Sequence, residues 1–240
     1  MAMKMKNPNA ELVDKLVQAN RILYDQGVVD GFGHVSVRHD SEPEVFLLSC
    51  NRAPGLVKRH DIVCYGYDGE ALSNPAERPY LERFIHGEIY RARPEVGSIV
   101  HSHSPSVIPF GVTKQPLQPV FHMAGFLGAG SAHFDIRAKA GSTDMLITNA
   151  QLGADLAEAL GQSVCVLMRG HGATIVGTSL AQAVYRAIYA EVNARLQLQA
   201  RSLGPITYLS EEEATLAAAT TESQTVRTWN LWVSRIGPVE

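Results

Sequence analysis

The chain has 240 residues, of which 45% are hydrophobic and 19% are charged, and its formal net charge is −3. This size supports one substantial hydrophobic core, so we expect a single domain over residues 1–240. Acidic and basic residues are interspersed along the chain, without a basic stripe or an acidic tail. That pattern argues against nucleic acid as a partner.

The beginning of the chain does not resemble a targeting segment. Its two lysines are followed by the charged stretch 11–25, not by an apolar run that ends in a cleavage site. No stretch is apolar and long enough to predict a membrane span. The chain has an odd number of cysteines, Cys50, Cys64 and Cys165, at unrelated spacings, which is typical of buried thiols. We therefore expect a cytoplasmic protein without a membrane partner.

The predicted elements alternate between helices and strands. Helices are indicated where apolar residues recur three and four positions apart, the first behind a possible Asn9 cap. Strands are indicated by short β-branched or apolar runs between Gly, Pro, Asn or Asp. In chain order we expect helix 11–25, strands 44–48 and 62–65, helix 80–90, strands 98–100 and 145–148, helix 152–160, strand 164–168 and helix 181–198. This order predicts an α/β sandwich with helices packed on a mainly antiparallel or mixed sheet.

Two histidines separated by one residue follow the apolar run 98–100. Alternate side chains of an extended chain share a face, so His101 and His103 can point at one object, as metal ligands do. Two surface or hydrogen-bonded histidines would give the same pattern. The motif by itself leaves both interpretations open.

A third histidine, His171, stands between two glycines directly after the predicted strand 164–168. The glycines permit a tight turn that would aim the imidazole inward, although a plain turn has the same sequence. Three such histidines suit a zinc-like catalytic site with one position open for water or substrate.

Glu82 falls in the predicted helix 80–90, next to the apolar side of that helix. An acid in this position could reach a cleft near the histidines. The alternative is an ordinary surface ion pair or contact with Arg78, Arg83 or His86 at helical spacing.

The order Glu82, His101-Ser102-His103, Gly170-His171-Gly172 resembles the class II aldolase/adducin superfamily. The resemblance covers nearly the whole chain. Residues 33–38, Gly-His-Val-Ser-Val-Arg, are similar to a Gly-Asn-x-Ser loop of that family, and Arg93-Pro94 precedes the metal-binding strand. The resemblance implies a three-layer α/β/α sandwich with a nine-stranded central sheet.

The same resemblance implies roles for the four candidate residues. The three histidines would bind a divalent ion, Zn²⁺ or Mn²⁺, and Glu82 would act as a proton carrier and sometimes as a ligand. Members of the family are usually fourfold-symmetric homotetramers with active sites between neighbouring subunits. We expect the same assembly here.

Departures from the family pattern bear on the substrate. Sugar-phosphate members place small hydroxyl residues before the catalytic acid, whereas this chain has Tyr80-Leu81. The other phosphate-binding stretch corresponds to 49–55, where Ser49, Asn51 and Arg52 are our candidates for substrate binding. One guanidinium with few hydroxyl groups suits a carboxylate better than a phosphate.

Two further histidines are candidate catalytic residues. His34 replaces the asparagine of the family loop, and His122 falls where the aldolases have a tyrosine acid donated by the adjacent subunit. Both are equally compatible with packing or with orienting the metal ligands.

A metal with an open face stabilises enolate-like charge, which decarboxylation and retro-aldol cleavage have in common. The chain resembles members that act without phosphate, including decarboxylases of hydroxy-substituted aromatic or pyridine carboxylates. We therefore favour loss of CO₂ from such an acid, with Glu82 or His122 protonating the carbanion. The alternatives are aldol cleavage of a non-phosphorylated hydroxy-ketone or hydroxy-acid and, less well supported, sugar-phosphate epimerisation. A non-catalytic adducin-like interaction module would not need the three histidines and the acid.

Overall fold

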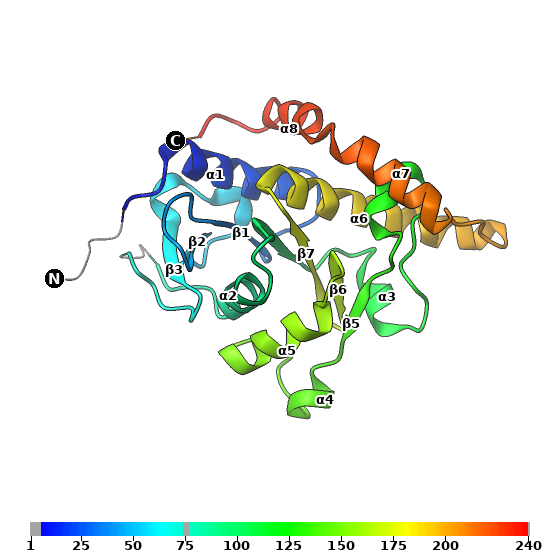
Figure 1. Cartoon of the computed structure of the whole chain (residues 1–240), viewed down its shortest axis with the longest axis horizontal. Coiled ribbons are helices and arrows are strands. Elements are labelled where there is room, and N and C mark those ends of the chain that lie inside the picture. Colours follow the sequence, from blue (N-terminus) through cyan, green and yellow to red (C-terminus); the bar gives the residue numbers. More distant parts are fainter. Residues whose placement is uncertain (1–5, 74–76, 240) are drawn as a thin grey trace.

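Apolar residues alternate between the two faces of the central strands, so the sheet needs a helical layer on each side. In the computed structural model, which describes residues 6–73 and 77–239, Phe46 and Leu48 face one core and Leu47 faces the other. On β4, Ile99 faces the same core as Phe46 and Leu48, and Val100 faces the same core as Leu47. The helices lie above and below the sheet in Figure 1, which gives the three-layer α/β/α arrangement that we expected.

The seven strands form one sheet in the order β3-β2-β1-β4-β7-β6-β5. All neighbouring strands are antiparallel except β5 and β6, which are parallel. This confirms a mainly antiparallel, mixed sheet, although the described residues form fewer strands than the nine of the resemblance. The strands are β1 (His34–Arg38), β2 (Val45–Ser49), β3 (Ile62–Gly66), β4 (Ser98–Ser102), β5 (Ala132–Phe134), β6 (Cys165–Met168) and β7 (Gly172–Gly177).

Helices α1 (Ala10–Asp25), α6 (Leu180–Leu203) and α8 (Thr225–Val233) cover one face of the sheet (Figure 1). The side chains of Asn9 and Ser179 cap α1 and α6 by accepting backbone N–H groups of the first turn. The apolar sides of these helices bury leucine, isoleucine, valine, tyrosine and tryptophan side chains against the strands.

Helices α2 (Arg83–Ala92) and α5 (Ala150–Leu160) cover the opposite face. They cross closely at Gly153, where a Cβ atom would overlap the carbonyl oxygen of Phe84. Because this close crossing presses α2 onto the sheet, Glu82, the residue that precedes α2, is held against the end of β4.

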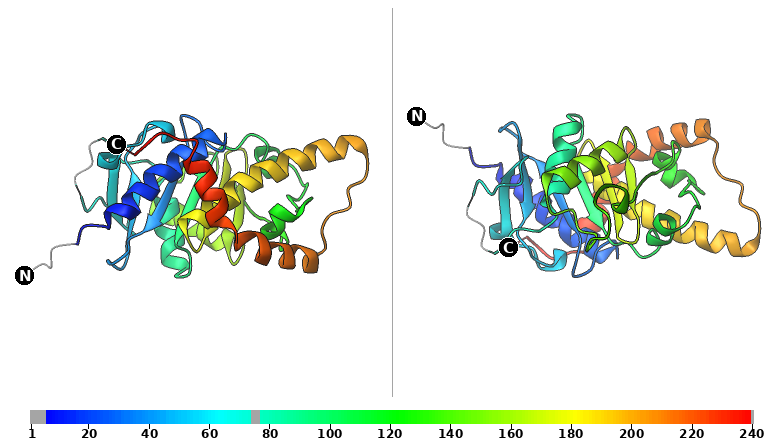
Figure 2. Two further views of the ribbon diagram at one scale, coloured as in Figure 1. Left: turned by 90° about the horizontal axis from the view of Figure 1, so that it is seen from above. Right: turned by 90° about the horizontal axis from the view of Figure 1, so that it is seen from below.

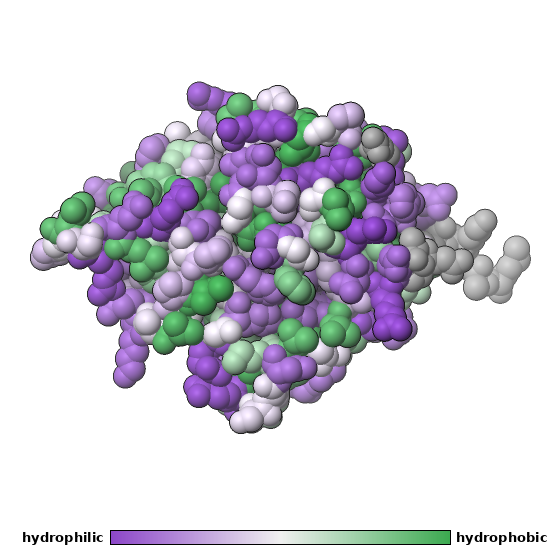
Figure 3. All heavy atoms as spheres, turned by 180° about the vertical axis from the view of Figure 1, so that it is seen from behind, coloured by the Kyte–Doolittle hydropathy of each residue, from purple (hydrophilic) through white to green (hydrophobic). Residues whose placement is uncertain are grey.

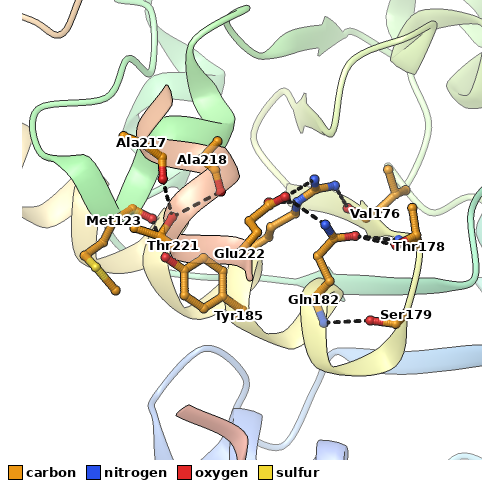
Figure 4. A network of polar contacts seen from close by, with 11 residues as sticks. Met123, Val176, Thr178, Ser179, Gln182, Tyr185, Ala217, Ala218, Thr221 and Glu222 are labelled. Carbon is orange, nitrogen blue, oxygen red and sulfur yellow. Dashed lines mark hydrogen bonds and ion pairs between the residues drawn. The ribbon is translucent and has the colours of Figure 1, made fainter. Parts of the chain in front are cut away.

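The remaining elements are α3 (Ile108–Val112), α4 (Arg137–Ala140), α7 (Glu211–Glu222), and the 3₁₀ turns η1 (Pro54–Leu56), η2 (Arg59–Asp61) and η3 (His122–Leu127). The end of α6 extends beyond the sheet, and the chain returns as α7 (Figure 2). An ion pair between Glu222 and Arg186 joins α7 to α6, and the Tyr185 hydroxyl donates to the Met123 carbonyl of η3 at 2.9 Å (Figure 4).

All four predicted helices and four of the five predicted strands are present, with ends shifted by a few residues. The strand predicted at 145–148 is wrong: Met145 has a positive φ of 71°, and the Ile147 N–H bonds a side chain instead of a neighbouring strand. Residues 34–38, expected as part of a loop, form strand β1, which lies inside the sheet between β2 and β4. Strands β5 and β7 and helices α7 and α8 were not predicted from the sequence.

The three cysteines are free and buried, as expected. In the described part of the chain, no helix combines the length and the apolar character needed to cross a bilayer. On the face shown in Figure 3, apolar residues are scattered among hydrophilic ones.

Candidate metal centre

Strand β4 brings the first two histidines together. His101 is the fourth residue of β4, directly opposite His34 of β1 and Thr174 of β7, and its side chain is fully buried. His103 follows just after the strand and is partly exposed. Because side chains alternate along an extended chain, both imidazoles lie on the same face. Their Nε2 atoms are 3.2 Å apart.

The turn between β6 and β7 supplies the third histidine. Gly170 has a positive φ of 66°, which lets the chain reverse within residues 169–171. The following strand, β7, pairs with β4, so His171 arrives beside the end of β4. Its Nε2 atom lies 3.1 Å from Nε2 of His103.

Glu82 is the residue immediately before α2, and it is 7% exposed. Its Oε1 atom accepts a hydrogen bond from the Ile147 N–H at 3.0 Å. Its Oε2 atom lies 3.4 Å from Nε2 of His171 and 3.6 Å from Nε2 of His101. Glu82 therefore belongs to the histidine cluster, and the surface ion pair considered from the sequence does not describe it.

The electrostatics of the cluster favour an ionised Glu82 carboxylate and neutral imidazoles at His101 and His103. Burial opposes ionisation of Glu82, but His101, His171 and the Ile147 N–H together lower its pKa to about 2. Burial also lowers the pKa of His101 well below the ordinary histidine value and lowers the pKa of His103. Deprotonated imidazoles and carboxylates are the forms that bind metal ions.

The four side chains fit a divalent cation. One ligand atom from each of Glu82, His101, His103 and His171 lies within 4.8 Å of the others. Nitrogens bound to tetrahedral zinc at about 2.0–2.1 Å are about 3.3 Å apart, close to the Nε2 separations of 3.1 and 3.2 Å found here.

A hydrogen bond behind His101 sets its tautomer for this role. The Thr174 hydroxyl donates to the sulfur of Met168 at 3.5 Å, and its oxygen lies 3.2 Å from Nδ1 of His101. This arrangement lets the hydroxyl oxygen accept a proton from Nδ1. This leaves the lone pair of Nε2 directed into the cluster.

His34 is the first member of a buried hydrogen-bonded chain that begins beside the cluster. Its ring packs against that of Tyr80, with centroids 4.7 Å apart, and its Nδ1 atom lies 2.7 Å from Nε2 of His86. Nδ1 of His86 is 2.6 Å from the Ser36 hydroxyl, which is 2.8 Å from the Tyr90 hydroxyl. The chain thus runs inward from the site between β1 and α2.

His86, Ser36 and Tyr90 were not predicted as site residues from the sequence, although their spacing indicates a polar network. His86 and Tyr90 follow Glu82 at intervals of four, which places polar groups in line along one side of a helix. Ser36 stands two residues after His34, on the same face of a strand. A row of polar residues on two buried faces indicates a polar network, because buried polar groups require partners.

The predicted substrate-binding residues lie at the end of β2 and on the loop that follows it. The Arg52 guanidinium donates to the carboxylate of the fully buried Asp61 at 3.2 Å, and the Tyr80 hydroxyl donates to the Arg52 carbonyl. The hydroxyl of buried Ser49 has no hydrogen-bond partner among the described residues, and Asn51 is exposed. This loop is connected to the histidine cluster through Tyr80.

His122 lies outside the cluster of this chain. It is the first residue of η3, and its side chain is exposed. The preceding segment is fixed to α6, where Asn193 accepts the Val120 N–H at 2.9 Å. The structure therefore brings together Glu82 and the four histidines at positions 34, 101, 103 and 171, but not His122.

Comparisons with known proteins show what the chain resembles in sequence and in fold. The chain is 39% identical to decarboxylase TropJ of Talaromyces stipitatus over 97% of this chain and 96% of the relative. It is 32% identical to 3,4-dihydroxyphthalate decarboxylase of Arthrobacter keyseri over 80% of this chain and 79% of the relative. The solved structure of L-fuculose 1-phosphate aldolase from Glaciozyma antarctica is similar in fold, with a TM-score of 0.78 at 23% identity, and the match covers 96% of this chain and 94% of that one.

The family model named class II aldolase and adducin N-terminal domain matches residues 14–198, a span that contains Glu82 and the three clustered histidines. Relatives named as decarboxylases and aldolases place the chain among the lyases. The chain is a member of the class II aldolase/adducin family.

Proposed function

We propose that this chain is a metal-dependent decarboxylase that removes CO₂ from a hydroxy-substituted aromatic or pyridine carboxylate. The observation that carries the proposal is the convergence of Glu82 with His101, His103 and His171. The relatives TropJ and 3,4-dihydroxyphthalate decarboxylase support it, because both are named for this type of reaction.

The three histidines would hold Zn²⁺ or Mn²⁺, with Glu82 beside them. When bound, the ion supplies a positive charge that stabilises the negative charge developing on the substrate as CO₂ leaves. The Thr174 hydroxyl keeps His101 in the tautomer that such binding requires. Burial keeps the imidazoles of His101 and His103 neutral by lowering their pKa values.

Decarboxylation leaves an electron pair on the ring carbon when the carbon–carbon bond breaks, and this carbon must then take up one proton. In our proposal the substrate hydroxyl gives its proton to Oε2 of Glu82, which returns the proton to the ring carbon. The transfer begins with Glu82 ionised, the state that His101, His171 and the Ile147 N–H favour, and it leaves the substrate hydroxyl as an aryloxide. The Ile147 N–H occupies Oε1, so Oε2 is the oxygen left for this transfer.

In our proposal the remaining candidate residues surround the substrate at the metal centre. His34, on the Tyr80 side, would orient the substrate or the ligands, and Ser49, Asn51 and Arg52 would line the adjoining wall. His122 would act in the site of a neighbouring subunit of a homotetramer. Its exposure, together with the fixed segment before it, supports this placement. We further propose that the protein is cytoplasmic.

The test is a substrate screen on purified protein whose metal content has been measured. We expect CO₂ release from hydroxyaryl or hydroxypyridine carboxylates, and its loss in the His171→Ala variant. Hydroxy-aldehydes with dihydroxyacetone are assayed in parallel. Aldol activity without CO₂ release would contradict decarboxylation and indicate an aldolase. Protein that binds no metal and turns over no substrate would indicate the adducin-like interaction module instead.

A further inference from the structure

A buried chain of four side chains runs from the metal centre into the protein, and the reaction described above uses none of its members beyond His34. The buried chain runs from His34 through His86 and Ser36 to Tyr90, and its successive nitrogen and oxygen atoms are 2.7, 2.6 and 2.8 Å apart. His86 and Ser36 are fully buried, and Tyr90 is 1% exposed. Burial keeps water from these groups, so each of their protons needs an acceptor within the buried chain.

His34 is the end of the buried chain that reaches the metal centre. It stands directly opposite His101 in the sheet, and the two ring centroids are 5.0 Å apart. Its Nδ1 atom is occupied by His86, whereas its Nε2 atom lies across the ring and bonds no other described residue. A substrate at the metal centre therefore meets the buried chain at Nε2 of His34.

The Tyr90 hydroxyl sets the direction of the hydrogen bonds. The Ser36 hydroxyl is its one hydrogen-bond partner among the described residues, so the Tyr90 proton goes to that oxygen. The Ser36 proton then goes to Nδ1 of His86, and the Nε2 proton of His86 goes to Nδ1 of His34. Both rings are buried, which favours neutral imidazoles with one proton each. The His34 proton is therefore on Nε2.

The reverse direction fails at the buried end. If Nδ1 of His34 donated to His86, then His86 would donate to the Ser36 hydroxyl. Ser36 would in turn donate to Tyr90, whose own hydroxyl proton would have no acceptor in the described part of the chain. If Tyr90 and His86 both donated to Ser36, the Ser36 proton would be the one without an acceptor. A buried donor without an acceptor is destabilising, so the direction that ends in a free N–H at the metal centre is favoured.

A fixed N–H donor beside the metal suits the oxygen whose negative charge grows during the reaction. In the proposed function the substrate hydroxyl gives its proton to Glu82 and becomes an aryloxide. A hydrogen bond to this oxygen strengthens as the charge develops, so it stabilises the transition state more than the substrate. His34 cannot be the base itself, because Nε2 already carries a proton and Nδ1 accepts one from His86.

We propose that His34 donates its Nε2–H to the substrate oxygen that becomes the aryloxide, and that the buried chain holds His34 in the tautomer that does so. This inference rests on the proposed function. The Nε2 proton stays on His34 throughout, while the hydroxyl proton moves to Glu82 and then to the ring carbon. His34 is thus a catalytic residue, and Ser36, His86 and Tyr90 are positioning residues.

The first test detects the tautomer directly. Solid-state ¹⁵N NMR of zinc-loaded protein labelled at histidine distinguishes protonated from unprotonated ring nitrogens, and the His34→Gln variant identifies the His34 signals. We expect the His34 proton on Nε2. A proton on Nδ1 of His34 would overturn the proposal.

The second test compares substitutions that keep or remove the donor. The probe is 4-nitrocatechol, whose absorbance shows how much of it binds as the aryloxide to zinc-loaded protein. An amide in His34→Gln can accept from His86 and still offer an N–H, whereas His34→Leu can do neither. We expect binding of the aryloxide to weaken about tenfold in His34→Leu and less in His34→Gln, at equal metal content. Equal losses in the two variants, or no loss in His34→Leu, would overturn the donor role.

Two serine variants test the buried chain. Ser36→Ala removes the hydroxyl between His86 and Tyr90, so we expect both His34 tautomers and weaker binding of the aryloxide. Ser98→Ala is the matched control, because it removes another fully buried hydroxyl that donates to the Ser36 carbonyl at 2.6 Å but lies outside the buried chain. The same tautomer and probe binding in both variants would overturn the positioning role.

The outcomes separate this inference from the proposed function, because neither the tautomer nor the probe requires turnover. If Ser36→Ala does not fold, the tautomer in wild type and the two His34 variants still decide the inference. Absence of CO₂ release from every hydroxyaryl carboxylate would overturn the proposed function itself. CO₂ release by a wild type whose His34 proton is on Nδ1 would overturn this inference alone.

Discussion

His34 and His86 face one another inside the protein, with Nδ1 of His34 2.7 Å from Nε2 of His86 and both rings buried. His86 also contacts the Ser36 hydroxyl at 2.6 Å, so both of its ring nitrogens are used. Removing the ring would leave Nδ1 of buried His34 without a partner, take away one of the two partners of the Ser36 hydroxyl, and open a cavity. We expect His86→Ala to lower the free energy of unfolding by about 3 kcal/mol. Tyr90→Phe, which removes only the terminal hydroxyl, should cost about 1 kcal/mol. Chemical denaturation measures both.

The pH dependence of stability gives a second check on His86. Burial lowers its pKa in the folded protein to about 3, below the ordinary value of 6.5. Below pH 6.5 the unfolded chain therefore binds a proton that the folded protein excludes, and stability falls as the pH decreases toward 3. We expect stability to fall less steeply with decreasing pH in His86→Gln than in wild type. Parallel slopes in the two proteins would contradict the buried neutral state of His86.

Glu82→Gln should separate proton transfer from metal binding. The amide has nearly the same shape and can still accept the Ile147 N–H, but it cannot carry a proton. We expect turnover to fall by at least about 100-fold, with the fold and most of the metal retained. Glu88→Gln, an equally buried acid on α2 that pairs with Arg91, is the matched control and should keep its activity. Loss of the metal together with activity in Glu82→Gln would instead identify Glu82 as a ligand.

Replacing any of the three clustered histidines by alanine should lower metal occupancy, because a three-histidine site loses one of its protein ligands. Metal content by mass spectrometry and metal-dependent thermal stabilisation are the measurements. His133→Ala, which removes an exposed histidine on β5, is the control and should bind metal as wild type does. Full occupancy in the His171→Ala protein would contradict the ligand assignment.

Two glycines beside His171 should respond differently to alanine. A Cβ at Gly172 would overlap the Ser102 carbonyl and lie 3.1 Å from Cδ2 of His103, so Gly172→Ala must shift β7 away from β4. We expect a loss of about 3 kcal/mol or more, with loss of metal. A Cβ at Gly170 would make only ordinary van der Waals contacts with the Met145 side chain, at 3.5 and 3.7 Å, but would have to adopt a positive φ, so Gly170→Ala should cost about 1–2 kcal/mol and keep the metal. Similar effects of the two substitutions would show that strand contact does not position the ligands.

His122 gives a test of shared active sites. Because its side chain is exposed in this chain, His122→Ala should leave unfolding and metal content unchanged while lowering turnover. If the imidazole acts in the neighbouring subunit, mixed oligomers of His122→Ala and His171→Ala chains should recover part of the activity that each variant lacks. Full activity of His122→Ala alone, or no recovery on mixing, would exclude this role.

Local sequence patterns predicted the helices and strands that are specified by the spacing of apolar residues within each element. The helical spacing of apolar residues predicted α1, α2, α5 and α6, and the short apolar runs predicted four of the strands. The spacing of His101 and His103 also implied a shared direction, because alternation along a strand is a property of the backbone. The order of Glu82 and the histidines indicated the family that the comparisons show.

Only the tertiary structure decided which side chains from different strands and helices contact one another. The Met145 region is apolar enough to predict a strand, yet it crosses the site and gives the Ile147 N–H to Glu82. His86 looked like a surface neighbour of Glu82, but the packing of α2 on β1 buries it against His34. Sequence spacing gives the direction of a side chain on its own element, whereas its partner is set by which element packs opposite. Arg169, which follows β6, pairs with Asp135, which follows β5 and lies 34 residues earlier in the chain.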